Sequence, residues 1–490
     1  MDSTNTSLPH RNELAEVLEY VVKQATDYLR NLDNRPVRSQ KAEEAAAAFN
    51  ASLPEEGGGA ASTLRSLIEK GLDAAVHSAG PNFFHFVVGG TTPAALGADW
   101  ITSLLDQMAY AWVASPLAVQ LELVSLSWLR DLFRLSASWA GIMTTGATMA
   151  NFVGLAAARQ WWGEQHGTNV AEQGLAGLPK IPVLTSGYIH ASAIKALAML
   201  GIGRSAVQTF SADTSGRLDL KGMEAALSRL DGSSAMIIGN AGEVNAGEFD
   251  PIGPLADLAE KYGAWLHVDG AFGLFARVSP RTAHLTEGVE RAHSVTVDGH
   301  KWLNVPYDCG FGFVSDPAVL GRAFAYTAAY LPDPDDPHPN MGSLGPESSR
   351  RARSLAVWAT LCAYGRQGYR TMVEQHLMLA QRMAQLVDEA PDLERLAHVP
   401  LNIVCFRYNP GGFSDGDLDQ LNRRLGEAIL KDGRVYAGTT LYKNQVALRP
   451  AIVNWRTTES DVDLFIEVVR ELGAKLSQEF KNEKNKDATI

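Results

Sequence analysis

Two stretches of the chain decide the fold, AWLHVDGA (264–271) and HSVTVDG (293–299). Each is a short, nearly continuous apolar run that ends in an aspartate and a glycine, as in strands buried on both faces of a parallel sheet. Similar runs are GIMTTG (141–146), PVLTSG (182–187), AMIIGNAG (235–242) and GFGFVSD (310–316), and helical patterns such as 149–159 and 193–200 lie between several of them. We predict an α/β fold whose mainly parallel sheet is flanked by helices, with functional groups at the carboxyl ends of the strands.

The alternating pattern sets a large α/β domain at residues 93–365, and the pattern changes beyond it. Residues 366–490 predict a small α+β C-terminal domain that ends in a frayed tail from residue 481. Its expected elements are helices at 368–389, 418–431 and 460–480, a strand at 402–410 and two strands within 435–453.

Residues 1–92 predict an N-terminal helical segment. Apolar residues recur at helical spacing from Asn12 to Leu32, which indicates an amphipathic helix. The stretch 42–62 holds three consecutive glycines and favours a flexible connector. The apolar face of the helix needs a partner surface, either on its own domain or on another subunit.

Composition narrows the function classes. The 490 residues carry a net charge of -12, which argues against binding to nucleic acid or anionic membranes. The three cysteines form no CxxC pair and the histidines no HExxH pattern, so we expect no metal site and no disulfide framework. The opening residues lack the pattern of a signal peptide and no apolar run is long enough to span a bilayer, so a cytoplasmic protein is expected.

Four features at successive strand ends point to one chemistry. TTGATMAN (144–151) opens a helix whose first N–H groups, with the Thr148 hydroxyl, suit a phosphate. His190 stands at a strand-to-helix turn, where an imidazole can stack on a flat ring. Asp269 ends an apolar strand and needs a cationic partner, such as a protonated pyridine nitrogen, with the small Ala271 beside it. Lys301 follows the next strand, where apolar neighbours favour the neutral amine that imine chemistry requires.

Each feature alone has an ordinary structural explanation: close helix packing, a hydrogen-bonded histidine, a helix cap or a surface lysine. Together, they match the needs of pyridoxal 5'-phosphate (PLP), which are a Schiff-base lysine and an acidic partner for the ring nitrogen.

Several motifs carry a family resemblance: TGATMANFVGLAAAR (145–159), SGYIHASAIKAL (186–197), WLHVDGAFG (265–273) and HKWLNVPYDCG (300–310). Together they resemble the group II PLP-dependent amino-acid decarboxylases, which include aromatic-L-amino-acid, glutamate and diaminobutyrate decarboxylases. The resemblance implies a type I PLP-dependent fold, like that of aspartate aminotransferase. It also implies a homodimer with active sites at the subunit interface, in which the N-terminal helices wrap the partner.

The resemblance also implies roles for individual residues. Lys301 would hold PLP as a Schiff base, Asp269 would pair with the ring nitrogen, and His190 would stack on the ring. The remaining positions would be Ala147, Thr148 and His300 at the phosphate end, Ala271 beside the ring, and Arg449 near the substrate.

Three departures from the family pattern stand out. Asp298-Gly299 replaces the Asn or Ser common before the lysine, and an acid would repel a phosphate, so we do not place Asp298 at the phosphate end. Glu243 stands where a small or hydroxyl residue is common. The loop 331–347 lacks the tyrosine with which family decarboxylases often protonate the carbanion, and His338 is a substitute candidate near the substrate.

The expected function is decarboxylation of an L-amino acid to its amine and carbon dioxide. The alternatives are a PLP-dependent aminotransferase, lyase or oxidative deaminase on the same scaffold, and a dimeric binding protein that has lost catalysis. The substrate stays open, although we expect Gly89-Gly90 and Thr91–Pro93 to border its pocket.

Overall fold

The computed structural model describes residues 11, 13–326 and 338–487. Its large sheet has seven strands in the order β1-β7-β6-β5-β4-β2-β3. These strands are β1 (Ala140–Thr144), β2 (Val183–Thr185), β3 (Val207–Thr209), β4 (Met236–Asn240), β5 (Trp265–Asp269), β6 (Ser294–Asp298) and β7 (Gly310–Val314). Pairing is parallel from β3 through β6, whereas β7 runs antiparallel to both β6 and β1. The mainly parallel sheet predicted from the apolar runs is therefore confirmed.

Helices cover both faces of this sheet, because side chains of its strands alternate between two cores. In β4, Met236 and Ile238 join the core that α6, α8 and α11 share, and Ile237 joins the core of α5, α9, α10 and α12. The helices of the large domain are α4 (Pro93–Leu105), α5 (Pro116–Leu132), α6 (Ala147–Gln165), α7 (Val170–Gln173), α8 (Ala191–Met199), α9 (Leu220–Ser228), α10 (Ile252–Tyr262) and α11 (Pro317–Phe324).

A long helix, α12 (Ser354–Glu389), leads to the C-terminal part and bends at Gly365, whose φ is 58°. There a four-stranded antiparallel sheet runs β10 (Thr439–Tyr442), β11 (Gln445–Leu448), β9 (Phe406–Tyr408) and β8 (Leu393–Arg395). With α13 (Asp415–Asp432) and α14 (Glu459–Asp487) it encloses a second core. The prediction of a frayed tail from residue 481 is wrong, since α14 continues to Asp487.

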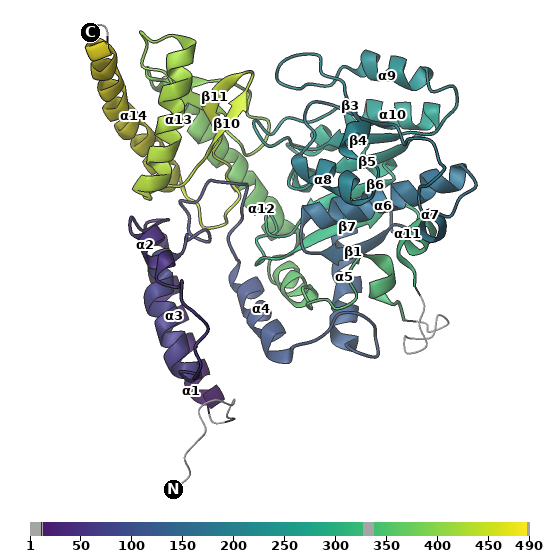
Figure 1. Cartoon of the computed structure of the whole chain (residues 1–490), viewed down its shortest axis with the longest axis horizontal. Helices are drawn as coiled ribbons and strands as arrows, with labels where there is room; N and C mark the ends of the chain where they lie inside the picture. The colour runs from purple at the N-terminus through teal and green to yellow at the C-terminus, as the bar shows by residue number, and fades with distance from the viewer. Residues whose placement is uncertain (1–10, 12, 327–337, 488–490) are drawn as a thin grey trace.

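The N-terminal helices α1 (Glu13–Asn31), α2 (Ala42–Ala47) and α3 (Ala60–Ala74) project from the body as an arm (Figure 1). Helices α1 and α3 pack on each other, yet neither has a fully buried residue. Leu14, Leu18 and Val22 of α1 and Leu67 of α3 are exposed. The predicted connector at 42–62 is interrupted, because α2 occupies its start and α3 begins at its end.

Candidate active site

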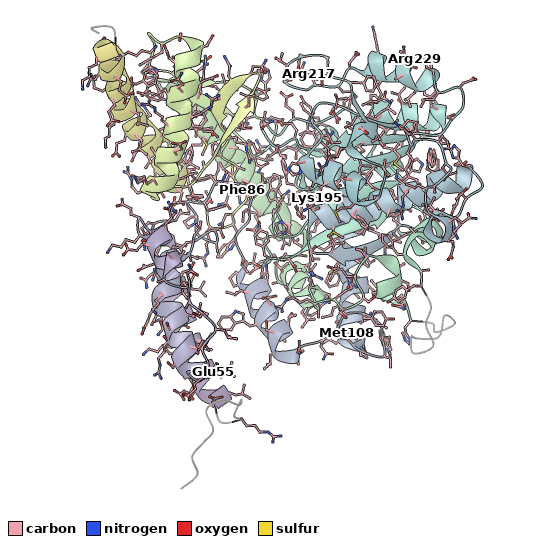
Figure 2. The ribbon with its side chains drawn as sticks, viewed as in Figure 1. Glu55, Phe86, Met108, Lys195, Arg217 and Arg229 are labelled. Atoms are coloured by element: carbon pink, nitrogen blue, oxygen red, sulfur yellow. The ribbon has the colours of Figure 1, made fainter. Side chains whose placement is uncertain are left out.

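A cavity of about 440 Å³ opens where β1, β4, β5 and β6 end. Phe86, which also lines it, lies between the part of the chain that holds the seven-stranded sheet and the part that holds the four-stranded sheet (Figure 2). Eight residues selected from the sequence line this cavity: Ala147, Thr148, His190, Asp269, Ala271, His300, Lys301 and Arg449. The carboxyl ends of parallel strands meet at one edge of the sheet, and this explains why residues so far apart in sequence converge.

Asp269, the last residue of β5, is almost completely buried, with 6% of its surface exposed. Its Oδ2 accepts a hydrogen bond from Asn151 Nδ2 at 2.9 Å, and its Oδ1 accepts one from the Ala271 N–H at 3.1 Å. In the described part of the chain no cationic side chain forms an ion pair with it. The carboxylate thus faces the cavity with neutral donors only.

A buried chain of hydrogen bonds fixes Asn151, which sequence reasoning missed. Asn151 Oδ1 lies 2.8 Å from His267 Nε2, and His267 Nδ1 lies 2.8 Å from Ser294 Oγ. Trp265 Nε1 donates to the same Ser294 oxygen at 2.9 Å. Burial lowers the pKa of His267 to about 4, so the imidazole is neutral and its Nε2–H donates to Asn151. This series of hydrogen bonds therefore orients the Asn151 side chain so that its amide N–H points toward Asp269.

Lys301 sits in the turn after β6, with its Nζ 3.0 Å from Asp298 Oδ2 and 5.7 Å from the centre of the Phe272 ring. Asn304, at φ 54°, closes this turn: its N–H donates to the Lys301 carbonyl, and its Oδ1 accepts from the Gly90 N–H. A Cβ on Gly89 would lie 2.0 Å from the Lys301 carbonyl oxygen. Only a glycine permits this approach, so the turn that carries the lysine has a fixed position.

The turn into α6 is the place where the sequence predicts a phosphate site. Gly146, at φ +149°, precedes the helix, and residues 145–149 line the cavity. The Ala147 N–H donates to Asp298 Oδ1 at 2.5 Å. The sequence left the role of Asp298 open, and the structure places its carboxylate in contact with the start of α6.

His190 is the N-cap of α8, and its Nδ1 lies 3.2 Å from the Ser192 N–H and 2.7 Å from the Ser192 hydroxyl. Desolvation lowers the pKa of His190, with the negative charge of Asp269 acting in the opposite direction. Because Nδ1 accepts from the Ser192 N–H, a neutral ring carries its proton on Nε2.

Arg449 and Glu243 also line the cavity. Arg449 is 9% exposed, and among the described residues none accepts a hydrogen bond from its buried Nη1. Burial lowers the pKa of Arg449, and Glu243 opposes this shift. The Glu243 carboxylate accepts hydrogen bonds from the N–H groups of Asn245 and Ala246. The Glu243 side chain therefore stabilises its own turn.

Other expectations turn out differently. Gly89 and Gly90 do not line the cavity; they pack against Lys301 and Asn454, whereas Phe86 and Val87 do line it. His338 also lies outside the cavity lining, and its exposed ring stacks on Trp112 with centroids 4.1 Å apart. Residues 331–337 of the loop lie outside the described residues, so the loop's part in the reaction and the role of His338 stay predictions.

Comparison with known proteins identifies the family. The profile "Pyridoxal-dependent decarboxylase conserved domain" matches residues 44–409. The chain belongs to this family. L-2,4-diaminobutyrate decarboxylase of Rhizobium meliloti (strain 1021) is 31% identical over 438 residues, covering 86% of this chain and 84% of the relative. Aromatic-L-amino-acid decarboxylase of Bacillus atrophaeus is 29% identical over 433 residues, covering 87% of this chain and 88% of the relative.

The fold of this decarboxylase matches solved relatives. A crystal structure of Oryza sativa TDC with PLP and tryptamine superposes with a TM-score of 0.88 at 25% identity, covering 95% of this chain and 99% of that chain. The predicted type I PLP fold, PLP as cofactor and PLP-dependent amino-acid decarboxylation as the reaction are thereby confirmed. Within the described residues no helix is both long and apolar enough to cross a bilayer.

The residues of the cavity fit PLP. Asp269 supplies a buried carboxylate that has no cationic partner in the described chain, as a protonated pyridine nitrogen requires. The α6 start supplies backbone N–H groups for a phosphate, and Lys301 supplies the amine at the cavity wall. The individual assignments remain predictions.

Proposed function

We propose that this decarboxylase converts an L-amino acid to its amine and carbon dioxide in the cavity around Lys301. The observation that carries the proposal is the buried Asp269 carboxylate, which shares that cavity with Lys301 and receives neutral hydrogen bonds only. A buried acid of this kind is costly unless a cation joins it. A ring nitrogen that keeps its proton is such a cation.

The chain's residues divide the work. When bound, PLP supplies the electron sink that stabilises the negative charge left at Cα as carbon dioxide departs. Lys301 would hold the cofactor covalently, and Asp269 would keep the proton on the ring nitrogen, at about 1.4 kcal/mol for each pKa unit of bias. His190, whose Nδ1 accepts a hydrogen bond from the Ser192 N–H, would lie over the ring face, and the start of α6 would hold the phosphate.

Arg449 is the residue we propose for a substrate carboxylate. Its buried Nη1 has no acceptor among the described residues, and its guanidinium lines the cavity. We expect Arg449→Gln to raise KM at least tenfold with a smaller change in kcat, because a charge-assisted contact of about 1.5–3 kcal/mol is lost. An unchanged KM in steady-state kinetics would remove Arg449 from the substrate site.

A second candidate function is an oxidative, aldehyde-forming reaction on the same scaffold, with dioxygen as the oxidant: amino acid, dioxygen and water would give aldehyde, carbon dioxide, ammonia and hydrogen peroxide. Two relatives carry the name phenylacetaldehyde synthase, one from Arabidopsis thaliana, 26% identical over 485 residues, and one from Petunia hybrida, 28% identical over 492 residues. The loop 331–347 of this chain, which has no tyrosine, supports keeping this alternative.

A panel of L-amino acids, with carbon dioxide, amine, ammonia and aldehyde all quantified, tests both candidates. Equal amounts of amine and carbon dioxide support decarboxylation, and equal amounts of aldehyde and ammonia support the alternative. Lys301→Ala should abolish turnover and the visible absorbance of the holoenzyme. Lys195→Ala is the matched control, since Lys195 lies exposed on α8 (Figure 2). If no amino acid yields an amine, the decarboxylase proposal fails.

We also infer that the enzyme works as a homodimer in the cytoplasm. The exposed apolar residues of α1 and α3 support a partner subunit as the surface that covers the arm. The unpaired cysteines Cys309, Cys362 and Cys405 support a reducing compartment. Light scattering of the full chain, beside a Leu14→Lys, Leu18→Lys variant, should give a dimer for the first and weaker association for the second. A monomeric full chain would refute the dimer.

A further inference from the structure

Asp298 occupies one of the backbone donors at the start of α6, where the proposed function places the phosphate of PLP. Its side chain is 3% exposed, and its Oδ1 accepts the Ala147 N–H at 2.5 Å. Its Oδ2 lies 3.0 Å from Lys301 Nζ and 3.5 Å from His300 Nε2. In the cofactor-free chain, a carboxylate thus serves as the anion at the positive end of α6.

Cofactor binding would change both the positive charge that compensates Asp298 and the negative charge beside it. Lys301 is the residue that the proposed function joins to PLP, so the ion pair that compensates Asp298 is altered. A phosphate monoester brings about 1.5–2 negative charges at neutral pH to the same helix start. Two acids in one buried site cannot both stay fully ionised without a compensating cation.

Few other groups can compensate. The titratable groups that face Asp298 are Lys301 and His300 on its own turn, Tyr307 and Cys309 leading into β7, and His190 across the cavity. Tyr307 stacks on His300 with ring centroids 4.1 Å apart, and burial lowers the pKa of His300, so that imidazole is a weak source of positive charge. The first turn of α6, ATMA, contributes backbone N–H groups and no charged side chain.

We propose that Asp298 makes PLP binding proton-linked: one proton is taken up from solvent when the phosphate enters the α6 cradle. The proton resides between the Asp298 carboxyl and a phosphate oxygen, as an O–H···O hydrogen bond that replaces the repulsion of two anions. No bond to carbon forms or breaks in this step. Affinity for PLP then falls as pH rises, because the proton required for binding becomes scarcer.

The proposal rests on the proposed placement of the phosphate at α6, and the test separates the two. PLP affinity and proton uptake are measured on the full-length apo chain, by titration calorimetry in two buffers of different ionisation enthalpy from pH 6.5 to 8.5. Pyridoxal, which has the aldehyde but no phosphate, is titrated in parallel. Asp298→Asn keeps the shape and an acceptor for the Ala147 N–H but loses the charge.

The wild-type chain should take up about one proton more per PLP than Asp298→Asn, and its affinity should fall up to tenfold more per pH unit. At pH 8.5 Asp298→Asn should bind PLP at least tenfold more tightly than wild type. Pyridoxal should show no such difference. Asp308→Asn, which changes a nearby acid paired with Arg353, is the control and should behave as wild type.

Equal proton uptake and equal pH slopes in wild type and Asp298→Asn would overturn the proposal, as would weaker PLP binding by the variant at every pH. The same difference with pyridoxal would also overturn it, because Asp298 would then act through Lys301 alone. Asp298→Ser is measured identically in case Asp298→Asn does not fold. If the wild-type chain shows no visible absorbance with PLP, the proposed function itself is refuted. This outcome differs from those that overturn only the role of Asp298.

Discussion

His267 is linked through Asn151 to Asp269, the acid that we propose as the partner of the cofactor's ring nitrogen. Burial holds its pKa near 4, against an ordinary value of 6.5, because the neutral ring sits between Asn151 and Ser294. The unfolded chain binds a proton at this residue below pH 6.5, whereas the native state resists it down to about 4. Stability contributed by neutral His267 is therefore complete above pH 6.5 and is lost as pH falls toward 4.

The size of this loss follows from the two pKa values. Between pH 7 and pH 5 one such histidine should lower the free energy of unfolding by about 2 kcal/mol. His267→Gln should therefore be less stable than wild type at pH 7, by about 1–3 kcal/mol for the unsatisfied partners Asn151 and Ser294. On going to pH 5 the variant should lose about 2 kcal/mol less than wild type.

Urea denaturation at one fixed protein concentration, at pH 7 and pH 5, measures both differences. His398→Gln, which changes an exposed histidine, is the control and should follow wild type at both pH values. If His267→Gln loses as much stability as wild type between pH 7 and pH 5, His267 does not stay neutral in the folded protein. The hydrogen-bond chain to Asp269 would then need another arrangement.

Two further predictions concern backbone approach and buried charge. Gly89→Ala should abolish the visible absorbance of the holoenzyme, because the new Cβ would lie 2.0 Å from the Lys301 carbonyl oxygen. Gly97→Ala is the control: a Cβ there has nothing within 4 Å, so this variant should gain up to about 1 kcal/mol in the free energy of unfolding. Normal absorbance in Gly89→Ala would refute this. Glu122→Gln should lower the urea-measured stability by about 3–5 kcal/mol, because Arg350, 2.7 Å away, would remain as an uncompensated buried charge.

Sequence patterns could predict the strand ends and the residues on them. Asp269 and Lys301 end neighbouring, strongly apolar strands, and geometry alone brings such positions to one edge. The strand β3 could not be predicted, because it is a short edge strand of the sheet with mostly exposed side chains and no apolar run. The prediction of a frayed tail was wrong because its charged residues can continue the helix α14 as readily as they can form a loop.

Contacts between residues that are far apart in the chain could not be predicted from the sequence. In the sequence, Asn151 stands out only as the end of the stretch predicted to bind a phosphate, yet it reaches Asp269 because α6 crosses the sheet beside β5 and β6. Phe86 and Val87 line the cavity and have positive φ values of 57° and 59°. Such a backbone conformation is rare for bulky or β-branched residues, so the sequence does not predict it. The role of Asp298 stayed open in the sequence because its contacts with Lys301 and with the start of α6 appear only in the folded chain.

The two acids of the site, Asp269 and Asp298, differ in the partners that the chain provides for their charges. Asp269 ends β5 with neutral donors only, so the cationic ring nitrogen that we propose as its partner would compensate its charge. Asp298 ends the adjacent β6 with Lys301 at 3.0 Å, so its charge is satisfied before the cofactor arrives and loses that compensation afterwards. A single ligand therefore stabilises one carboxylate and destabilises its neighbour. Binding is strongest when the second acid can take up a proton while the first stays ionised, which favours the acidic side of neutrality.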